Sequence, residues 1–298
     1  MLLKAVKLVL FISLTLILVL PVGYFVFDSV ELKGDVNDVG VKKNSIGVYV
    51  INLETSKERY EYIKDNIKSL GFPQIRIDAV DGRKMSKEEI DAKVDVKTYK
   101  SFLSRLPNGG TIGCYLSHVK VWEEFLKSGF EFAVVFEDDI SFDPGRVKLV
   151  IGDLIETPSF WDIVSLEQRH NGLPLIIKKL KNDQELVVYL AEVTHSGAYI
   201  INRRAAYNLL KKAFPMRMPL DHYFTRAWEF DLKFTGVENP RLVKQTFGES
   251  DIGKTEAISE ENRTVFDKLK RGMYKFQSYI IRFLYNCKIY IQAILHYI

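Results

Sequence analysis

Short apolar runs without polar alternation recur along the middle of the chain and predict strands that are buried on both faces. The clearest covers residues 132–136, Phe-Ala-Val-Val-Phe, and ends abruptly in three acids, Glu137, Asp138 and Asp139. Similar runs predict further strands at residues 46–53, 75–80, 161–166, 186–190, 198–201 and, as a pair broken at Asn239-Pro240, 234–245.

Between these strands, apolar residues recur every three or four positions and predict helices. The first starts near Thr55 and Glu58, which stand in capping-box spacing, and ends at Gly71. Others are expected from residue 112 to the stop at Gly129, over residues 203–214, and from Leu220, and residues 83–108 read as a polar helical excursion. This order predicts an α/β domain with helices above and below a parallel sheet.

The N-terminal end is uncharged from Leu8 to Phe27, which is twenty residues and long enough to cross a bilayer. A cleaved signal peptide is the alternative, but no small-x-small cleavage site precedes Asp28. Lysines before the segment and acids after it favour a cytoplasmic N-terminus. We therefore expect a single-pass membrane anchor at residues 1–28, followed by a linker at residues 29–45. Pro21 and Gly23 leave open a kinked segment in one leaflet.

The C-terminal end changes character from residue 265, where apolar residues recur at intervals of three or four up to Ile298. Lys268, Arg271, Lys275 and Arg282 cluster on the opposite face. A basic, aromatic-rich amphipathic helix of this length is typical of membrane-surface binding. The pattern predicts a catalytic domain at residues 46–250, then a linker and a membrane-associating helix at residues 251–298. A helix packed as a structural cap is the alternative.

Charge and cysteine content narrow the classes of partner. The net charge is +4, with basic residues gathered toward the C-terminus, which favours an acidic surface such as phospholipid over a groove that follows nucleic acid. Cys114 and Cys287 lie far apart without Cys-x-x-Cys spacing, so a zinc ribbon is excluded and a disulfide scaffold has no support.

The three acids carry the candidate chemistry. In open α/β sheets the ligand crevice lies at the carboxyl ends of the strands, where Glu137, Asp138 and Asp139 are expected. Adjacent carboxylates repel one another unless a cation shares the site. Oxygen-rich clusters suit Mg²⁺ or Mn²⁺, which can also hold a diphosphate. An acidic turn after a strand is the alternative interpretation. The absence of Gly-x-Gly-x-x-Gly argues against a dinucleotide.

Other polar residues follow strand ends or begin helices. Asn52 and Arg59 follow the first strand, and Asp78 and Asp81 follow the second. His118 lies on the next helix beside Ser117, although a histidine satisfied by a neighbouring backbone group is equally compatible. Asp221 and His222 open a short helix as a possible metal or base pair, with a plain N-cap as the competing account of Asp221.

Seven segments occur in one order: Val50-Ile-Asn-Leu53 with Arg59, Asp78-Ala-Val-Asp-Gly82, Gly113-Cys-Tyr-Leu-Ser-His118, Val135-Phe-Glu-Asp-Asp139, Trp161-Asp-Ile-Val-Ser-Leu166, Gly197-Ala-Tyr-Ile200 and Pro219-Leu-Asp-His-Tyr223. Together they resemble the family-25 glycosyltransferases, the group that includes lipooligosaccharide β-1,4-galactosyltransferases and collagen galactosyltransferases. The resemblance runs from about residue 46 to residue 246.

The resemblance implies a GT-A (Rossmann-like) fold, a UDP-sugar donor, most often UDP-galactose, and Mn²⁺ (or Mg²⁺). It places Glu137, Asp139 and His222 at the metal and assigns catalysis to Asp221 and Asp138, with His195 as a further candidate to complete the site. The nucleotide-sugar pocket would be lined by Asn52, Arg59, Asp78, Asp81, Ser117 and His118.

The implied reaction is inverting transfer of galactose to a hydroxyl of a glycan or glycolipid acceptor of the lipopolysaccharide type. A metal would offset charge on the UDP leaving group, and a carboxylate would take the proton of the attacking hydroxyl. Transfer of another sugar, nucleotidyl transfer by the same fold, and a non-catalytic membrane scaffold are the alternatives.

The expected location is a membrane, either the bacterial inner membrane or the endoplasmic reticulum and Golgi. The charges that flank the anchor place the domain outside the cytosol, whereas UDP-sugars are made inside it. The two agree in a secretory pathway, where Asn262-Arg-Thr264 would be a usable glycosylation sequon. In a bacterium, a re-entrant or reversed anchor would be needed.

Overall fold

A computed structural model describes residues 42–170, 174–246 and 265–295, all of which belong to one compact unit, Val39–Ile298. The predicted anchor at residues 1–28 and the sequon at Asn262 lie outside the described residues. Within the described part of the chain, no helix combines the length and the apolar character that crossing a membrane requires.

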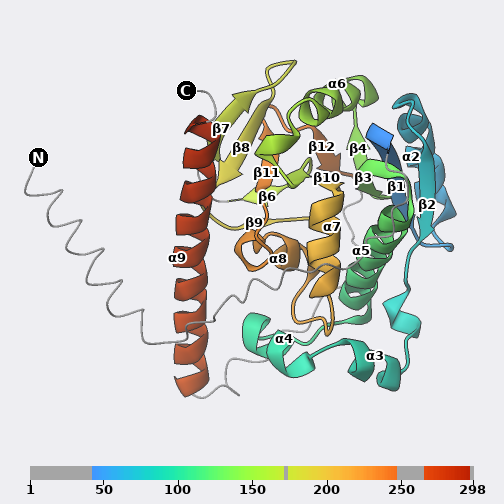
Figure 1. The fold of residues 1–298 in the computed structure, drawn as a ribbon. Helices are drawn as coiled ribbons and strands as arrows, with labels where there is room; N and C mark the ends of the chain where they lie inside the picture. The colour runs from blue at the N-terminus through green and yellow to red at the C-terminus, as the bar shows by residue number, and fades with distance from the viewer. Residues whose placement is uncertain (1–41, 171–173, 247–264, 296–298) are drawn as a thin grey trace, which may run out of the picture. The chain divides into compact units, whose positions relative to one another are not determined.

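A mixed sheet forms the centre of the unit (Figure 1). In the described residues it has eight strands in the order β2-β1-β3-β10-β5-β11-β8-β7. The strands are β1 (Lys42–Asn52), β2 (Gln74–Asp78), β3 (Phe130–Glu137), β5 (Ile163–Ser165), β7 (Pro174–Lys179), β8 (Glu185–Tyr189), β10 (Ala198–Asn202) and β11 (Phe234–Glu238).

The prediction of a parallel sheet is wrong in part. β1 runs parallel to β2 and β3, and β5 runs parallel to β11, but β10 lies antiparallel between β3 and β5. β8 is also antiparallel to β11 and to β7. A continuous apolar run shows that a strand is covered on both faces, but it contains no information on strand direction. The α/β class is confirmed, with a mixed sheet.

Helices cover both faces of this sheet, and β3 shows how its side chains divide between them. Ala133 and Val135 belong to the core cluster under α5 (Gly109–Lys127), α7 (Arg203–Lys211) and α8 (Leu220–Phe224). Val134 and Phe136 belong to the opposite cluster, under α2 (Lys57–Ser69) and α6 (Pro144–Ile155). Because successive side chains of a strand point to opposite faces, an uninterrupted apolar run is needed to fill both cores.

Several smaller elements complete the unit. The predicted excursion is helical, with η1 (Gly82–Lys84), α3 (Lys87–Lys93) and α4 (Val96–Leu103). The pattern missed α6, β7 and the short elements β4 (Ile140–Phe142), η2 (Pro158–Phe160), β6 (Arg169–His170), β9 (Val193–Thr194) and η3 (Ala227–Glu229). The last predicted strand pair is confirmed as β11 and β12 (Val243–Gln245), but β12 pairs with β4 and not with the main sheet.

The capping box predicted at Thr55 and Glu58 is wrong. The N-cap residue of α2 is Ser56, and its side chain makes no capping hydrogen bond. A complete capping box lies instead at the start of α3, where Ser86 and Glu89 exchange hydrogen bonds with each other's backbone N–H groups. The predicted end of α2 at Gly71 is consistent with its φ of 75°, which glycine adopts without strain.

The C-terminal helix α9 (Val265–Leu295) lies along one side of the unit beside β7 and β8 (Figure 1). It packs through a partly polar face, because Arg282 and Asn286 are buried together with Ile289 and Ala293. Asn286 Nδ2 donates to the carbonyl of Tyr189 at 2.5 Å. The predicted helix is therefore confirmed, but Arg282, which was expected on a solvent-facing basic stripe, lies against the domain.

The first turn of α5 meets the loop after β2 through backbone contacts that leave no space for a side chain. A Cβ atom on Gly113 would lie 2.3 Å from the carbonyl oxygen of Val80, and one on Gly82 would lie 2.2 Å from that of Gly109. Ser117 Oγ accepts from the Val80 N–H at 2.8 Å in the same contact. Glycine at these positions lets the loop and the helix approach closely.

We predict that Gly113→Ala lowers the free energy of unfolding by about 1–3 kcal/mol, because the added methyl group forces the loop and α5 apart. Urea unfolding followed by circular dichroism measures this. Gly152→Ala is the matched control, since a Cβ there meets nothing within 4 Å and alanine favours the helix. The control should be neutral or stabilising by about 0.5–1 kcal/mol. Equal unfolding midpoints for the two variants would contradict the prediction.

Candidate functional site

A cavity of about 90 Å³ opens where β1 and β3 end side by side. The two strands are parallel, with Ile51 opposite Glu137, so their carboxyl ends meet at one edge of the sheet. The loop after β2 and the first turns of α5 form the other walls. Eight of the predicted site residues line this cavity: Asn52, Arg59, Asp81, Ser117, His118, Glu137, Asp138 and Asp139.

Asp138 is held by protein groups on both of its oxygens. Asn52 Nδ2 donates to Oδ2 at 2.6 Å, and Arg59 lies 3.6 Å from Oδ1. Asn52 is itself buried and accepts from Arg76 through its own side-chain oxygen at 2.7 Å. These contacts stabilise the ionised carboxylate and fix its position. The catalytic role predicted for Asp138 stays a prediction.

Glu137 receives hydrogen bonds from two elements. His118 Nε2 lies 3.2 Å and Ser196 Oγ 3.0 Å from its Oε1. Burial by itself would raise the pKa of Glu137, but the hydrogen bonds from His118 and Ser196 outweigh it, so the pKa lies below its ordinary value. Glu137 is therefore an anion at neutral pH.

A chain of hydrogen bonds assigns the tautomer of His118. Trp122 Nε1 can only donate, and it lies 3.0 Å from the hydroxyl oxygen of Tyr199. That hydroxyl lies 2.9 Å from His118 Nδ1 and is free to donate its own proton there. The Nε2 of His118 then carries the ring proton and donates it to Glu137. His118 thus positions the carboxylate from the core side.

Asp139 differs from its two neighbours. Gln245 Nε2 donates to its Oδ2 at 2.9 Å, but its Oδ1 is buried without a hydrogen-bond partner. Burial and the charges of Glu137 and Asp138 raise the pKa of Asp139 to about 6. A buried carboxylate oxygen without a donor, beside other acids, is the arrangement that a bound cation stabilises. The residues present therefore fit a divalent metal ion.

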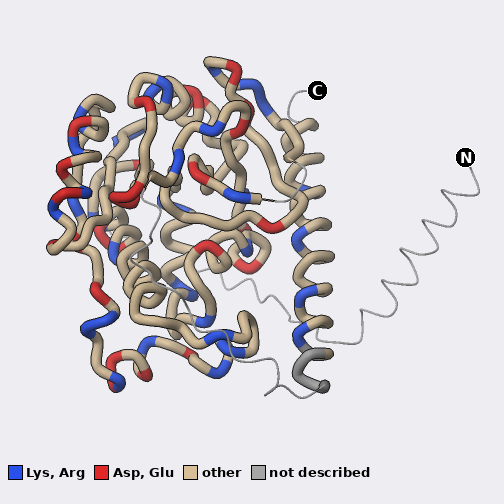
Figure 2. The backbone as a smooth tube through the Cα atoms, turned by 180° about the vertical axis from the view of Figure 1, so that it is seen from behind, with Lys and Arg blue, Asp and Glu red and all other residues tan. Residues whose placement is uncertain are grey.

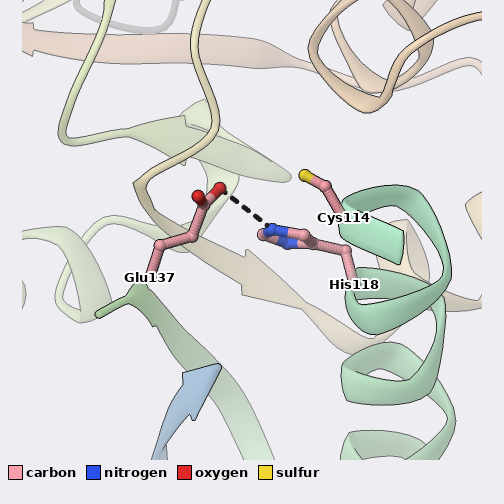
Figure 3. Close-up of side chains that lie close together, drawn as sticks. All are labelled: Cys114, His118 and Glu137. Atoms are coloured by element: carbon pink, nitrogen blue, oxygen red, sulfur yellow. Dashed lines mark hydrogen bonds and ion pairs between the residues drawn. The ribbon is translucent and has the colours of Figure 1, made fainter. Parts of the chain in front are cut away.

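Cys114 was missed as a site residue in the sequence. It stands four residues before His118 on α5, and both side chains point toward Glu137 at the end of β3 (Figure 3). The possible ligand atoms of these three residues lie within 4.8 Å of one another. The i, i+4 spacing places both side chains on one face of the helix and is the signal that could have identified Cys114.

Two possible donor sets therefore share Glu137. Cysteine and histidine suit softer metals, whereas carboxylates suit Mg²⁺ or Mn²⁺. Burial and the nearby charges of Glu137, Asp221 and Asp139 raise the pKa of the Cys114 thiol well above its ordinary value, so the thiol is protonated. The Nε2 of His118 is also protonated in the tautomer assigned above. A metal ion bound by Cys114 and His118 would therefore have to displace both protons.

Asp221 and His195 are joined to the acids by the loop that enters β10. The His195 N–H donates to Asp221 Oδ2 at 3.3 Å, and the neighbouring Ser196 contacts Glu137. His195 has a φ of 78° and bonds to Glu167 through Nδ1 at 2.6 Å, and this bond raises the pKa of the imidazole. Asp221 itself does not line the 90 Å³ cavity.

Asp221 is not the N-cap residue of α8, which corrects the competing account of this residue. The N-cap position belongs to Pro219, and Asp221 lies in the first turn. Its Oδ1 accepts from the N–H of His222 at 2.8 Å.

His222 and Asp78 are not brought to the acids. His222 bonds to Glu192 at 3.0 Å and lines a separate cavity. The side chain of Asp78 is exposed, and its carbonyl oxygen accepts from Lys120 Nζ at 3.0 Å. Their predicted roles as a metal ligand and a nucleotide-binding residue gain no geometric support and stay predictions.

Comparison with known proteins agrees with this geometry. Residues 45–224 match the family model "Glycosyltransferase family 25 (LPS biosynthesis protein)". A glycosyltransferase 25 family member from Aedes aegypti is 30% identical over 201 residues, which cover 61% of this chain and 31% of that protein. Procollagen galactosyltransferase 1-A from Xenopus laevis is 27% identical over 184 residues, 59% of this chain and 30% of that protein.

Relatives named as inactive occur as well. The probable inactive glycosyltransferase 25 family member 3 from Bos taurus is 28% identical over 191 residues, 59% of this chain and 30% of that protein. The alignments thus span about a third of the length of these relatives. The family model nevertheless covers more than half of this chain, including most of β1, all of β2 and β3, the acids and Asp221. The chain belongs to glycosyltransferase family 25.

Proposed function

We propose that this protein transfers galactose from UDP-galactose to a hydroxyl group of a glycan or glycolipid acceptor, with inversion and with Mn²⁺ or Mg²⁺ as cofactor. The observation that carries the proposal is the buried Asp139 Oδ1 without a hydrogen-bond partner, which lies beside other acids at the carboxyl edge of the sheet. The family membership and the galactosyltransferases among the relatives support the sugar. A GT-A type of nucleotide-sugar domain is consistent with the mixed sheet.

The proposed mechanism divides the acids by their contacts. Glu137 and Asp139 would hold the cation, which would supply positive charge opposite the diphosphate of the donor. Asp138 keeps Asn52 and Arg59 in place at the wall of the cavity.

Asp221 is the proposed general base. The loop that enters β10 links it to the acids, because the His195 N–H donates to Asp221 and the neighbouring Ser196 hydroxyl donates to Glu137. As the acceptor oxygen bonds to the anomeric carbon, the bond from that carbon to UDP breaks, and Asp221 takes the hydroxyl proton. Its backbone contact with His195 orients the carboxylate.

We predict that Asp139→Asn lowers Mn²⁺-dependent release of UDP from UDP-galactose by about 100-fold, because the neutral amide no longer offsets the charge of the ion. Mn²⁺ binding, measured by calorimetry, should weaken in parallel. Asp65→Asn on the exposed side of α2 is the matched control and should behave as wild type.

Three outcomes would reject the function. An Asp139→Asn variant that retains full Mn²⁺ stimulation would exclude the acid site. Release of pyrophosphate in place of UDP would indicate nucleotidyl transfer. A folded wild-type protein that neither binds nor hydrolyses any of a panel of UDP-sugars would indicate a non-catalytic member of the family.

The membrane is the proposed partner of α9. The side of this helix away from the domain exposes a stripe of large apolar residues: Leu269, Met273, Phe276, Phe283, Leu284 and Ile291. A straight stripe along a helix of 31 residues fits a flat apolar surface. The uncharged segment at residues 8–27, proposed as the anchor in a bacterial inner membrane or in the endoplasmic reticulum and Golgi, would hold that surface nearby.

We predict that residues 39–298, without the anchor, sediment with vesicles of phosphatidylcholine and phosphatidylglycerol. Replacing both Phe276 and Phe283 with serine should weaken this binding at least about tenfold, since two half-exposed phenyl rings would no longer enter lipid. Tyr62→Ser is the matched control, because Tyr62 is 52% exposed on α2. Failure of the parent chain to bind vesicles at low salt would contradict the prediction.

A further inference from the structure

A second cavity of about 280 Å³ lies between α4, α8 and the N-terminal half of α9, apart from the acid site. Its walls are strongly basic. Five of the described residues that line it carry cationic groups: Arg105, Arg226, Arg271, Lys275 and Arg282. Three of the five belong to α9, and Figure 2 shows Lys and Arg recurring along that helix.

Among the described lining residues, cations outnumber acids. Glu192 is the one acid among the described lining residues, and it is already shared between His222 at 3.0 Å and Arg282 at 3.6 Å. Glu229 lies outside the lining and pairs with Arg226 Nε at 2.5 Å. Among the described residues, Arg226, Lys275 and Arg282 therefore face two carboxylates. Like charges held together in a partly buried space repel each other unless an anion enters.

Two of the arginines that line the cavity are almost fully removed from solvent. Arg282 is 4% exposed and Arg226 is 6% exposed. The Nε of Arg282 is buried and has no hydrogen-bond partner. Burial, followed by the charge of Arg226, lowers the pKa of Arg282, although Glu192 acts in the opposite direction. A buried guanidinium group with an unused N–H is a donor prepared for an anion.

Aromatic rings hold these guanidinium groups in place. Arg226 lies 4.7 Å and Arg282 5.1 Å from the ring centre of Trp228. Arg226 also lies 5.5 Å from the ring centre of Tyr274. Stacking fixes the plane of each guanidinium group, so that its N–H groups have a defined direction. Planar forks in fixed positions match the oxygens of a phosphate group.

We propose that this cavity binds a phosphate or diphosphate group of the acceptor. The inference rests on the proposed function, because it assigns the anion to the acceptor substrate. His222 is in the cavity wall and directly follows Asp221, the proposed general base, so an acceptor with its anion bound here would extend from this cavity toward Asp221. The phosphate would belong either to a lipid that carries the glycan or to the glycan itself.

The first test measures binding of inorganic pyrophosphate to the full-length protein by calorimetry, in the presence of EDTA. Lys275→Gln should weaken binding about tenfold, because it removes one charged donor from an exposed position at the cavity. Lys288→Gln makes the same chemical change on an exposed part of α9 outside the lining and should have no effect. Equal affinities for wild type and Lys275→Gln would overturn the proposal.

A second variant tests the buried donor. Arg282→Lys keeps the positive charge but removes the planar fork, so pyrophosphate binding should weaken while the circular dichroism spectrum is unchanged. If Arg282→Lys binds pyrophosphate as well as wild type does, the arginines serve only to attach α9 and the proposal is wrong.

A third arm identifies the source of the phosphate. Stronger binding to vesicles with phosphatidic acid than to phosphatidylglycerol vesicles of equal charge, lost in Lys275→Gln, would place the phosphate on a lipid. Pyrophosphate binding without this preference would place the phosphate on the glycan.

Hydrolysis of UDP-galactose by water needs no acceptor, so Lys275→Gln should leave this hydrolysis unchanged. If wild type hydrolyses UDP-galactose but does not bind pyrophosphate, only the phosphate-binding role of the cavity is rejected. If it does not hydrolyse UDP-galactose, the proposed function is rejected.

Discussion

Three consecutive carboxylates at the end of a strand with a buried centre are the constraint on which this structure depends. Their mutual repulsion would destabilise the fold unless each charge met a partner. Two of the three carboxylates have such partners in the fold. The parallel pairing of β1 and β3 brings Asn52 to Asp138, and Glu137 lies opposite α5, where His118 donates to it. Asp139 is left with a buried oxygen that no protein group satisfies. Asp139 is therefore the carboxylate of this site that can act on a ligand.

Much of the remaining structure supports this edge of the sheet. The glycine contacts between the loop after β2 and α5 place His118, and the core chain of Trp122 and Tyr199 sets its tautomer. The loop before β10 connects Glu137 to Asp221 through Ser196 and His195. Each acid is thus held from a different element, so small shifts of α5 or of the β10 loop would alter the charge balance of the site. This is why contacts distant from the cavity matter to it.

The helix α9 has two chemically different surfaces. Its inward face supplies cations to a cavity beside α8, and its outward face exposes large apolar side chains. A helix that served only as a cap would bury its apolar face, because burial of those side chains is the larger stabilising contribution. Packing through Arg282 and Asn286 leaves the apolar face for another surface. If both proposals hold, the helix would connect the acceptor side of the domain with a membrane.

Local pattern in the sequence determined the positions of most strands and long helices and the location of the acids at a strand end, because burial on two faces and helical periodicity are properties of adjacent residues. The order of the seven segments also indicated the family. Only the tertiary structure decided the direction of β10, the approach of Cys114 to Glu137 and the separation of His222 from the acids. It also decided which face of α9 meets the domain. These features depend on contacts between residues far apart in the chain, and an amphipathic pattern specifies two faces of a helix without specifying which of them packs inward.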